Sequence, residues 1–222
     1  DNTYLYLGTD NGILVYNYRT DKYEQPDTDF PTDVRTMVLQ GDTLWIGSLN
    51  GLYTYQLKSR QLNHFDSKQT GLPHNTIYSI IHTKDNQIYI GTYNGLCRYV
   101  QASGKFENIL LPVNRGGSNL FVNSLLEDTT RQCIWIGMEG YLFQYNPTIG
   151  EMKAIEVFHN NSIKSLALDG DENLLAGTDN GLYVYQNDKE PLQHIIHDSR
   201  NIQSLTNNII WNIFADQEQN IW

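Results

Sequence analysis

One short phrase of apolar and turn residues recurs five times along the chain, and it limits the possible folds more than any other feature. The copies read LYLGTDNGILVY, LWIGSLNGLYTY, IYIGTYNGLCRY, IWIGMEGYLFQY and LLAGTDNGLYVY. Their first glycines are 39, 44, 46 and 40 residues apart and lie at Gly8, Gly47, Gly91, Gly137 and Gly177. A period of about 40–50 residues built from short strands is typical of a β-propeller.

Each copy of the phrase predicts a β-hairpin. Its first half is an apolar run that usually holds an aromatic residue, such as Trp45 or Trp135, and this pattern favours a strand buried on both faces. Asn-Gly follows in four copies, as at Asn50-Gly51, and predicts a type I′ turn. A tyrosine stands eight residues after every repeat glycine, at Tyr16, Tyr55, Tyr99, Tyr145 and Tyr185.

Two further segments complete each repeat. A more polar stretch after the hairpin suits an outer strand, as in 61–66, 105–109 and 152–157. An apolar stretch lies between repeats, at 34–39, 77–82, 122–127, 163–168 and 209–214. We therefore predict an all-β chain in which each repeat forms a four-stranded antiparallel propeller blade, with about five blades covered.

The phase of the repeat also predicts how the chain is organised. We expect one propeller domain over residues 1–222, with a sixth repeat that begins near Ile209. The next glycine in phase would be residue 224, beyond the 222 residues of this sequence. We therefore predict that the chain is a part of a longer array of repeats. In an alternative arrangement, residues 209–214 pair beside residues 4–7 and close a ring of five blades.

Composition excludes several classes of function. A net charge of −10 and a pI near 4.9 disfavour nucleic acid or an anionic membrane surface as a partner, because phosphate binding needs a basic face. With 40% hydrophobic residues, the chain can bury a substantial core. The two cysteines, Cys97 and Cys133, form no metal or redox spacing and are predicted to be buried thiols.

No catalytic motif, metal-ligand cluster or cofactor loop is present, and we predict no catalytic residue, no metal and no cofactor. A glycosidase needs two carboxylates that face each other across a pocket. The acids that precede the second strands fit turn positions instead, at Asp42, Asp85, Asp128, Asp171 and Asp216. Glu139 differs, since it replaces the turn asparagine in the fourth copy.

The loops offer the best candidate site. In a propeller, the turn between the second and third strands and the link to the next blade share one face. Here the links are rich in Asn, Gln, Arg and His and are flanked by aromatic residues, a mixture that suits a sugar, although solvated loops have the same polarity. The candidate ligand-binding residues are His74, Tyr93, Arg115, Asn119, Phe121, Glu139, Arg200 and Trp211.

The repeat resembles the two-component regulator propeller repeat. The resemblance is carried by TLWIGSLNGL (43–52) and NQIYIGTYNGL (86–96), and by the linking stretches GLPHNTIYSI (71–80) and SLTNNIIWNI (204–213). Two copies depart from it: the fourth lacks the usual turn, and the fifth, at Leu174-Leu175-Ala176, lacks the aromatic residue. The shared motif is structural, so no ligand-binding residue carries over from the family.

This resemblance implies a function. Members form the periplasmic sensor region of hybrid two-component systems, usually as seven-bladed propellers ahead of a membrane helix and a histidine kinase. By resemblance, the chain would be a non-enzymatic part of a seven-bladed ring that binds an oligosaccharide and signals to a kinase elsewhere. Its partners would be the rest of the ectodomain and a second copy of the receptor. The alternatives are a propeller-fold glycan lyase or glycosidase, and a protein–protein interaction scaffold.

Overall fold

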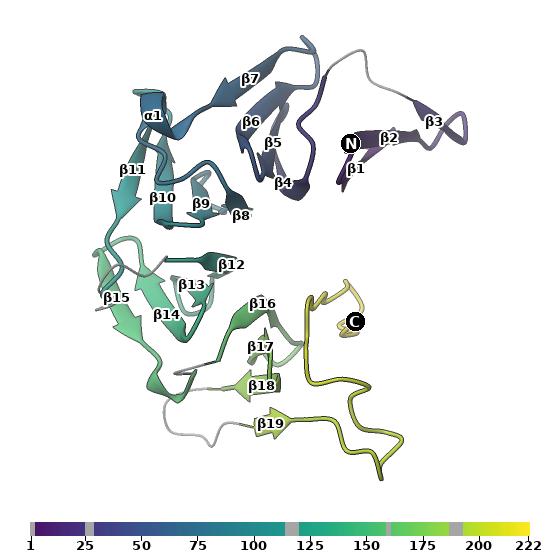
Figure 1. Cartoon of the computed structure of the whole chain (residues 1–222), viewed down its shortest axis with the longest axis vertical. Helices are drawn as coiled ribbons and strands as arrows, with labels where there is room; N and C mark the ends of the chain where they lie inside the picture. The colour runs from purple at the N-terminus through teal and green to yellow at the C-terminus, as the bar shows by residue number, and fades with distance from the viewer. Residues whose placement is uncertain (1–2, 25–28, 114–119, 159–160, 187–192) are drawn as a thin grey trace. The chain divides into compact units, whose positions relative to one another are not determined.

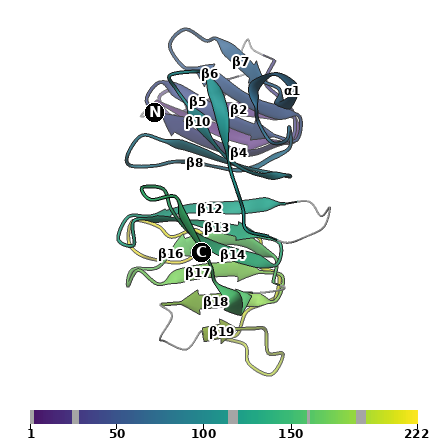
Figure 2. The same ribbon diagram turned by 90° about the vertical axis from the view of Figure 1, so that its left-hand side faces the viewer.

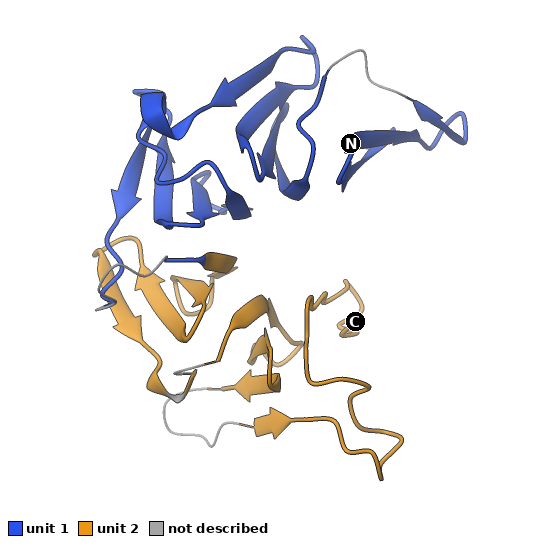
Figure 3. Ribbon diagram, in the orientation of Figure 1, with its two compact units in different colours: residues 1–121 blue, residues 122–222 orange. Residues whose placement is uncertain are grey.

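The computed structural model describes residues 3–24, 29–113, 120–158, 161–186 and 193–222 (Figure 1). These residues form antiparallel sheets, with one short helix, α1 (Ser67–Thr70), and one 3-10 turn at Glu156–Phe158. The predicted all-β propeller class is therefore confirmed. The chain divides into two compact units, residues 1–121 and 122–222 (Figure 3).

Unit 1 contains three sheets in chain order. The first is three-stranded, with β1 (Tyr4–Thr9), β2 (Gly12–Asn17) and β3 (Lys22–Glu24). The second holds β4 (Val34–Gln40), β5 (Thr43–Ser48), β6 (Gly51–Gln56) and β7 (Leu62–Phe65). The third holds β8 (Ile77–His82), β9 (Ile88–Thr92), β10 (Gly95–Val100) and β11 (Lys105–Ile109).

Unit 2 contains two further four-stranded sheets. One holds β12 (Val122–Asp128), β13 (Cys133–Met138), β14 (Tyr141–Asn146) and β15 (Glu151–Ala154). The other holds β16 (Ile163–Leu168), β17 (Leu174–Thr178), β18 (Gly181–Tyr185) and β19 (Gln193–Ile195). Their first strands, β12 and β16, lie next to each other (Figure 2). In all four complete sheets, each strand pairs with the next along the chain, as expected for a blade.

The stretch 209–214, predicted to be a strand, is not one in the described structure. A strand extends only where a neighbouring strand supplies hydrogen bonds. Among the described residues, Ile210 donates one backbone hydrogen bond, to the carbonyl of Thr178 at 2.8 Å, and Phe214 exchanges two with Trp222, of 3.0 and 2.8 Å, beside a bridge between Ala215 and Ile221. The prediction of a strand at 209–214 is therefore wrong for this structure.

The hairpin turns differ from the predicted type I′ geometry. A positive φ falls on the glycine alone, for example 118° at Gly12 and 143° at Gly51, and not on the two residues before it. Glycine in this conformation commonly follows a type I turn. In four of the five turns a Thr or Ser hydroxyl before the turn closes it, as where Thr92 donates to the carbonyl of Gly95 at 2.9 Å.

The position of Glu139 also needs correction. Met138 pairs with Tyr141 in the fourth repeat, just as Ser48 pairs with Gly51 in the second. Glu139 therefore takes the first turn position, and Gly140, with a φ of 81°, takes the place of the asparagine. Strand pairing therefore shows which residues of the two turns correspond, and sequence similarity alone does not.

Close packing between neighbouring sheets explains the repeated glycine. A Cβ atom on Gly47 would lie 2.6 Å from Cγ2 of Ile77 on the next first strand. The same distance separates a Cβ on Gly137 from Cγ2 of Ile163. Real Cβ atoms do not approach this closely, so only glycine lets adjacent sheets meet here.

The repeated tyrosine has a related role. Trp45 meets Tyr99 of the following repeat edge to face, with ring centroids 4.8 Å apart. Trp135 meets Tyr185 in the same way at 5.9 Å. Such pairs add to the stability that comes from burial alone. The phrase therefore recurs because each copy must fit against the next copy of itself.

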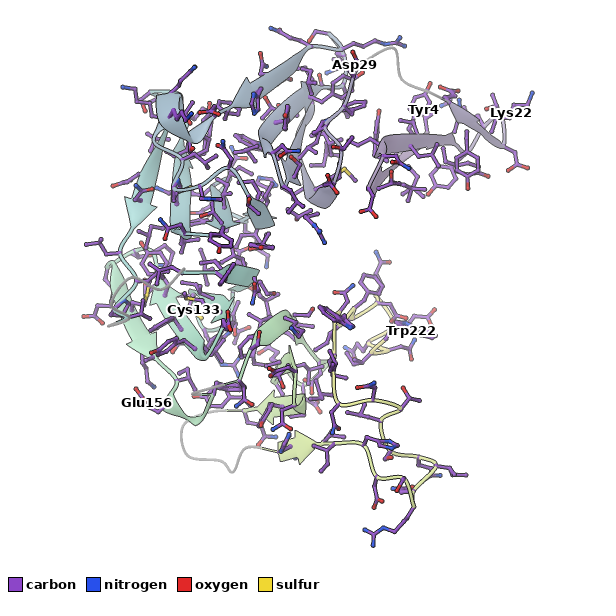
Figure 4. All side chains as sticks on the ribbon, viewed as in Figure 1. Tyr4, Lys22, Asp29, Cys133, Glu156 and Trp222 are labelled. Atoms are coloured by element: carbon purple, nitrogen blue, oxygen red, sulfur yellow. The ribbon has the colours of Figure 1, made fainter. Side chains whose placement is uncertain are left out.

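Both cysteines are buried and unpaired, which confirms the prediction of buried thiols. Cys133 lies inside unit 2, where Trp135 belongs to the same core cluster (Figure 4). Burial raises the pKa of each thiol, so neither has the thiolate character of a reactive cysteine.

A buried carboxylate ties the two sheets of unit 2 together. Asp128 is fully buried; its carboxylate accepts hydrogen bonds from the Trp135 indole at 2.9 Å and the Arg131 guanidinium at 2.7 Å. Arg131 continues to the next sheet, where it donates to the carbonyls of Glu172 and Gln186 at 2.9 and 3.0 Å. The acid therefore serves packing, as its turn-like sequence position suggested, and also links sheets.

This carboxylate predicts a dependence of stability on acid. Burial raises the pKa of Asp128, but hydrogen bonds from the Arg131 amide, the Trp135 indole and the Arg131 guanidinium outweigh burial and lower it overall. The unfolded chain then binds protons more tightly, so this stabilisation is present above about pH 4 and lost as pH falls through the folded-state pKa. We expect denaturant unfolding to show a declining free energy of unfolding below that pH.

The variant Asp128→Asn identifies the source of this decline. Half-buried acids whose pKa is also lowered, Asp66, Asp198 and Asp216, remain in the variant and keep part of the acid dependence. We expect a shallower decline for the variant than for the parent protein. Equal slopes for the two proteins would show that Asp128 does not contribute.

Candidate functional site

Backbone hydrogen bonds join the hairpin turns to the links between sheets. In unit 1 the amide of Gly95 donates to the carbonyl of Leu120 at 3.0 Å. In unit 2 Gly140 donates to Asn161 at 2.9 Å, and Gly181 donates to Asn208 at 2.6 Å. Turns and links therefore share one end of the sheets in each unit, as predicted. We call this the loop end of the unit.

Three of the predicted site residues meet at the loop end of unit 1. The rings of His74 and Tyr93 lie 4.9 Å apart, and those of Tyr93 and Phe121 lie 4.1 Å apart. Tyr78, on β8, joins them with its ring centroid 6.0 Å from that of Phe121. We call these four residues the aromatic cluster.

The aromatic cluster is held from several elements and remains partly exposed. His74 lies in the link before β8, Tyr93 in the turn between β9 and β10, and Phe121 directly before β12. The imidazole Nδ1 of His74 accepts a hydrogen bond from the amide of Thr76 at 3.0 Å, which fixes the ring. Within the described residues its Nε2 has no hydrogen-bond partner. The cluster thus offers aromatic faces and a polar nitrogen.

The predicted site residues of unit 2 lie on separate elements. Glu139 is exposed in the β13–β14 turn and forms a bridge with Ser162. Arg200 forms an ion pair with Asp198 at 3.1 Å within its own loop. Trp211 is 73% exposed, and Lys164 Nζ lies 4.6 Å from its ring centroid. Within the residues described for unit 2, no hydrogen bond, ion pair or ring contact joins these three predicted residues to one another.

The remaining two predicted site residues, Arg115 and Asn119, fall outside the described residues.

Sequence reasoning missed a set of residues on the first strands. Each complete sheet has a β-bulge there, where the register with the second strand shifts. The residues left out of the ladder are Arg35, Tyr78, Asn123 and Lys164. We call these the bulge residues. Bulges re-aim side chains and are common beside functional sites. The available signal was a Val or Ile followed two residues later by Ser or Thr.

Two shallow hollows lie away from the loop ends. One, of about 160 Å³ in unit 1, is lined by residues that include Gln40, Asn86 and Arg98. The other, of about 330 Å³ in unit 2, is lined by residues that include Arg131 and Glu151. Neither contains a predicted site residue. Their lining comes from strands and turns toward the opposite sheet ends, where Gln40 and Arg131 already bind the next sheet.

The charges do not suggest acid–base chemistry. Among the described residues, every carboxyl group with a shifted pKa is shifted down: Asp66, Asp128, Asp198 and Asp216. Hydrogen bonds from the Trp222 indole and the Asn220 side-chain amide lower the pKa of Asp216 to about 2. A general acid at neutral pH requires a raised pKa. The described residues contain no group of three metal-ligating side chains, and no described helix is long and apolar enough to cross a membrane.

Comparison with known proteins supports the repeat identity. Residues 71–94 match the family described as two component regulator propeller. A protein named histidine kinase P4, from Formosa agariphila, is 26% identical over 254 residues, which cover 98% of this chain and 17% of that protein. These matches, with the structures below, confirm the resemblance seen in the sequence.

Two solved structures extend the comparison. The extracellular domain of a putative hybrid two component system from B. thetaiotaomicron is 80% identical, with a TM-score of 0.97 over 100% of this chain and 30% of that one. A second such domain from B. thetaiotaomicron is 21% identical, with a TM-score of 0.79 over 99% of this chain and 30% of that one, and shows the shared fold. The chain spans less than a third of each of these relatives.

Proposed function

Because this chain carries the two component regulator propeller repeat, we propose that it is a ligand-sensing part of the periplasmic ectodomain of a hybrid two-component sensor. Its ligand is an oligosaccharide bound at a loop end, and its signal reaches a kinase elsewhere in the protein. Its partners are the rest of the ectodomain and, in the full-length receptor, a second copy. The relation to extracellular domains of hybrid two-component systems supports this role.

The aromatic cluster is the observation that carries the choice of ligand. Pyranose rings present apolar faces that stack on aromatic rings, and their hydroxyls need hydrogen-bond partners at the edges. Tyr93 and Phe121 supply faces, and the Nε2 atom of His74 supplies a polar edge. A signal further requires that the sugar bind one arrangement of the receptor more tightly than another.

The rival function is a propeller-fold lyase or glycosidase. Such an enzyme would need an acid and a base whose pKa values are set apart for proton transfer. The downward shift of every shifted carboxyl among the described residues favours the sensor. A scaffold that contacts only protein is the third possibility, and it would bind no small glycan.

A thermal-shift screen of the intact protein tests the proposal. The panel consists of soluble fragments of pectin, hemicellulose, starch and host glycosaminoglycans. A ligand at about 100 times its Kd adds about 2.7 kcal/mol, which raises the melting temperature by several degrees. We expect one class of sugar to raise it and to be recovered intact. Recovery of cleaved sugar would indicate an enzyme, and no shift across the panel would favour the scaffold.

A further inference from the structure

The residues on either side of the bulge are nearly constant. A buried valine or isoleucine precedes each bulge residue, and a serine or threonine follows it. The close approach of Gly47 to Ile77, and of Gly137 to Ile163, explains the residue before the bulge. Packing between sheets therefore accounts for the apolar residue before the bulge in these two sheets.

The bulge residue itself changes completely. Arginine, tyrosine, asparagine and lysine occupy the position in the four complete sheets. The stretch Ile210-Trp211-Asn212 places a tryptophan at the equivalent position, since a Cβ on Gly177 would lie 2.6 Å from Ile210. In a repeat array, one variable position on a constant support is where different side chains can be presented to a ligand.

In unit 2, side chains at the bulges contact residues of the next sheet or stretch along the chain. Lys164 Nζ lies 4.6 Å from the centre of the Trp211 ring, and Asn123 donates to the carbonyl of Ile163 at 3.0 Å. In unit 1, burial raises the pKa of Tyr78, and the charge of Arg35 offsets part of the rise. Within unit 2 the bulge position of one sheet therefore contacts the first strand or stretch that follows it.

The two cations in this set are free of carboxylates. In the part of the chain that the structure describes, neither Arg35 nor Lys164 forms an ion pair, although the net charge is −10. Lys164 lies over the ring of Trp211, with Nζ 4.6 Å from its centroid. A cationic hydrogen-bond donor next to an aromatic face matches the edge and the face of a pyranose.

We infer that the bulge residues, together with Trp211, are specificity-determining contacts for an oligosaccharide at the loop end of their own unit. In unit 1 Arg35 donates hydrogen bonds to sugar hydroxyls and Tyr78 stacks on a sugar ring, and in unit 2 Lys164 and Trp211 have these roles. This inference rests on the proposed function and deepens it. In unit 1 the bulge residue Tyr78 belongs to the aromatic cluster, so a ligand bound to that cluster meets this bulge residue as well.

Calorimetric titration of the intact protein tests the inference. The probe is the panel sugar that gives the largest thermal shift. The variants are Arg35→Ala and Lys164→Ala, and the matched controls are Arg19→Ala and Lys105→Ala, which remove exposed cations away from the bulges. We expect Kd to rise about tenfold or more in at least one bulge variant and to stay unchanged in both controls. The order of preference across the panel should change as well.

The outcomes separate the two proposals. If the parent protein binds a sugar and both bulge variants bind it with parental affinity and preference, the inference is overturned and the proposed function stands. If no panel sugar binds the parent protein, both are overturned. Melting temperatures without ligand check the folding of each variant. Arg35→Lys and Lys164→Arg keep a cationic donor and should retain more affinity than the alanine variants.

Discussion

Asp128→Ala is expected to lower the free energy of unfolding by about 3–5 kcal/mol, because it breaks a buried ion pair and leaves its partner uncompensated. The Trp135 indole, which is 1% exposed, loses its acceptor, and the Arg131 side chain, 25% exposed, loses its counter-charge. Denaturant unfolding of the intact protein measures the change.

The exposed turn acid Asp171 provides the control. Within the described residues Asp171 hydrogen-bonds only through its backbone amide, which donates to the Asp169 carboxylate at 2.9 Å. Asp171→Ala should therefore change the free energy of unfolding by less than about 0.5 kcal/mol. Asp128→Asn keeps an acceptor for the indole and should lie between the two. A loss below about 1 kcal/mol for Asp128→Ala would contradict the role given to this carboxylate.

Gly137→Ala should destabilise the protein by about 1–3 kcal/mol, the usual range for overpacking. Its new Cβ would lie 2.6 Å from Cγ2 of Ile163 and 3.3 Å from Cδ1 of Leu166. Because both neighbours belong to the core of unit 2, neither can move without disturbing others. The free energy of unfolding again measures the effect.

A second substitution shows whether this clash is the cause. Ile163→Ala removes the Cγ2 atom and alone should cost about 2–5 kcal/mol, because it leaves a cavity. In the double variant the new methyl enters space that the isoleucine vacated. We expect the double variant to lose at least about 1 kcal/mol less than the sum of the single changes. Additive losses would mean that the glycine is needed for another reason.

Much of the fold could be predicted because neighbouring repeats impose the same packing on every copy. Gly47 and Gly137 are glycines because the next sheet touches them, and Tyr99 and Tyr185 recur because a preceding tryptophan meets them. Constraints of this kind repeat at a fixed period, so they are visible in the letters of the sequence.

The bulges, the turn types and the contacts of Arg131 could not be predicted, because they depend on hydrogen bonds that the sequence pattern does not determine. A bulge such as Ile77–Ser79 changes the register without changing the apolar pattern of the strand. The predicted type I′ turns were wrong because the Asn-Gly sequence is compatible with more than one turn type. The reach of Arg131 to the carbonyl of Gln186, 55 residues away, is set by the packing of two sheets.

The candidate site was predicted in part. The repeat phase placed His74, Tyr93 and Phe121 at one sheet end, and the structure brings their rings together. It could not foresee that Arg200 would be held by Asp198 in its own loop. Strand residues such as Lys164 were not predicted, because binding residues were expected in the loops between strands.

Hydrogen–deuterium exchange of the intact protein with and without the panel sugar that binds most tightly tests the central claim most directly. The account predicts slower exchange at loop-end segments, in peptides covering residues 72–80, 93–96 or 161–166. Exchange at the opposite sheet ends, residues 83–87 and 129–132, should stay the same. Protection confined to those opposite ends, around the hollows lined by Asn86 and Arg131, would contradict a loop-end sugar site.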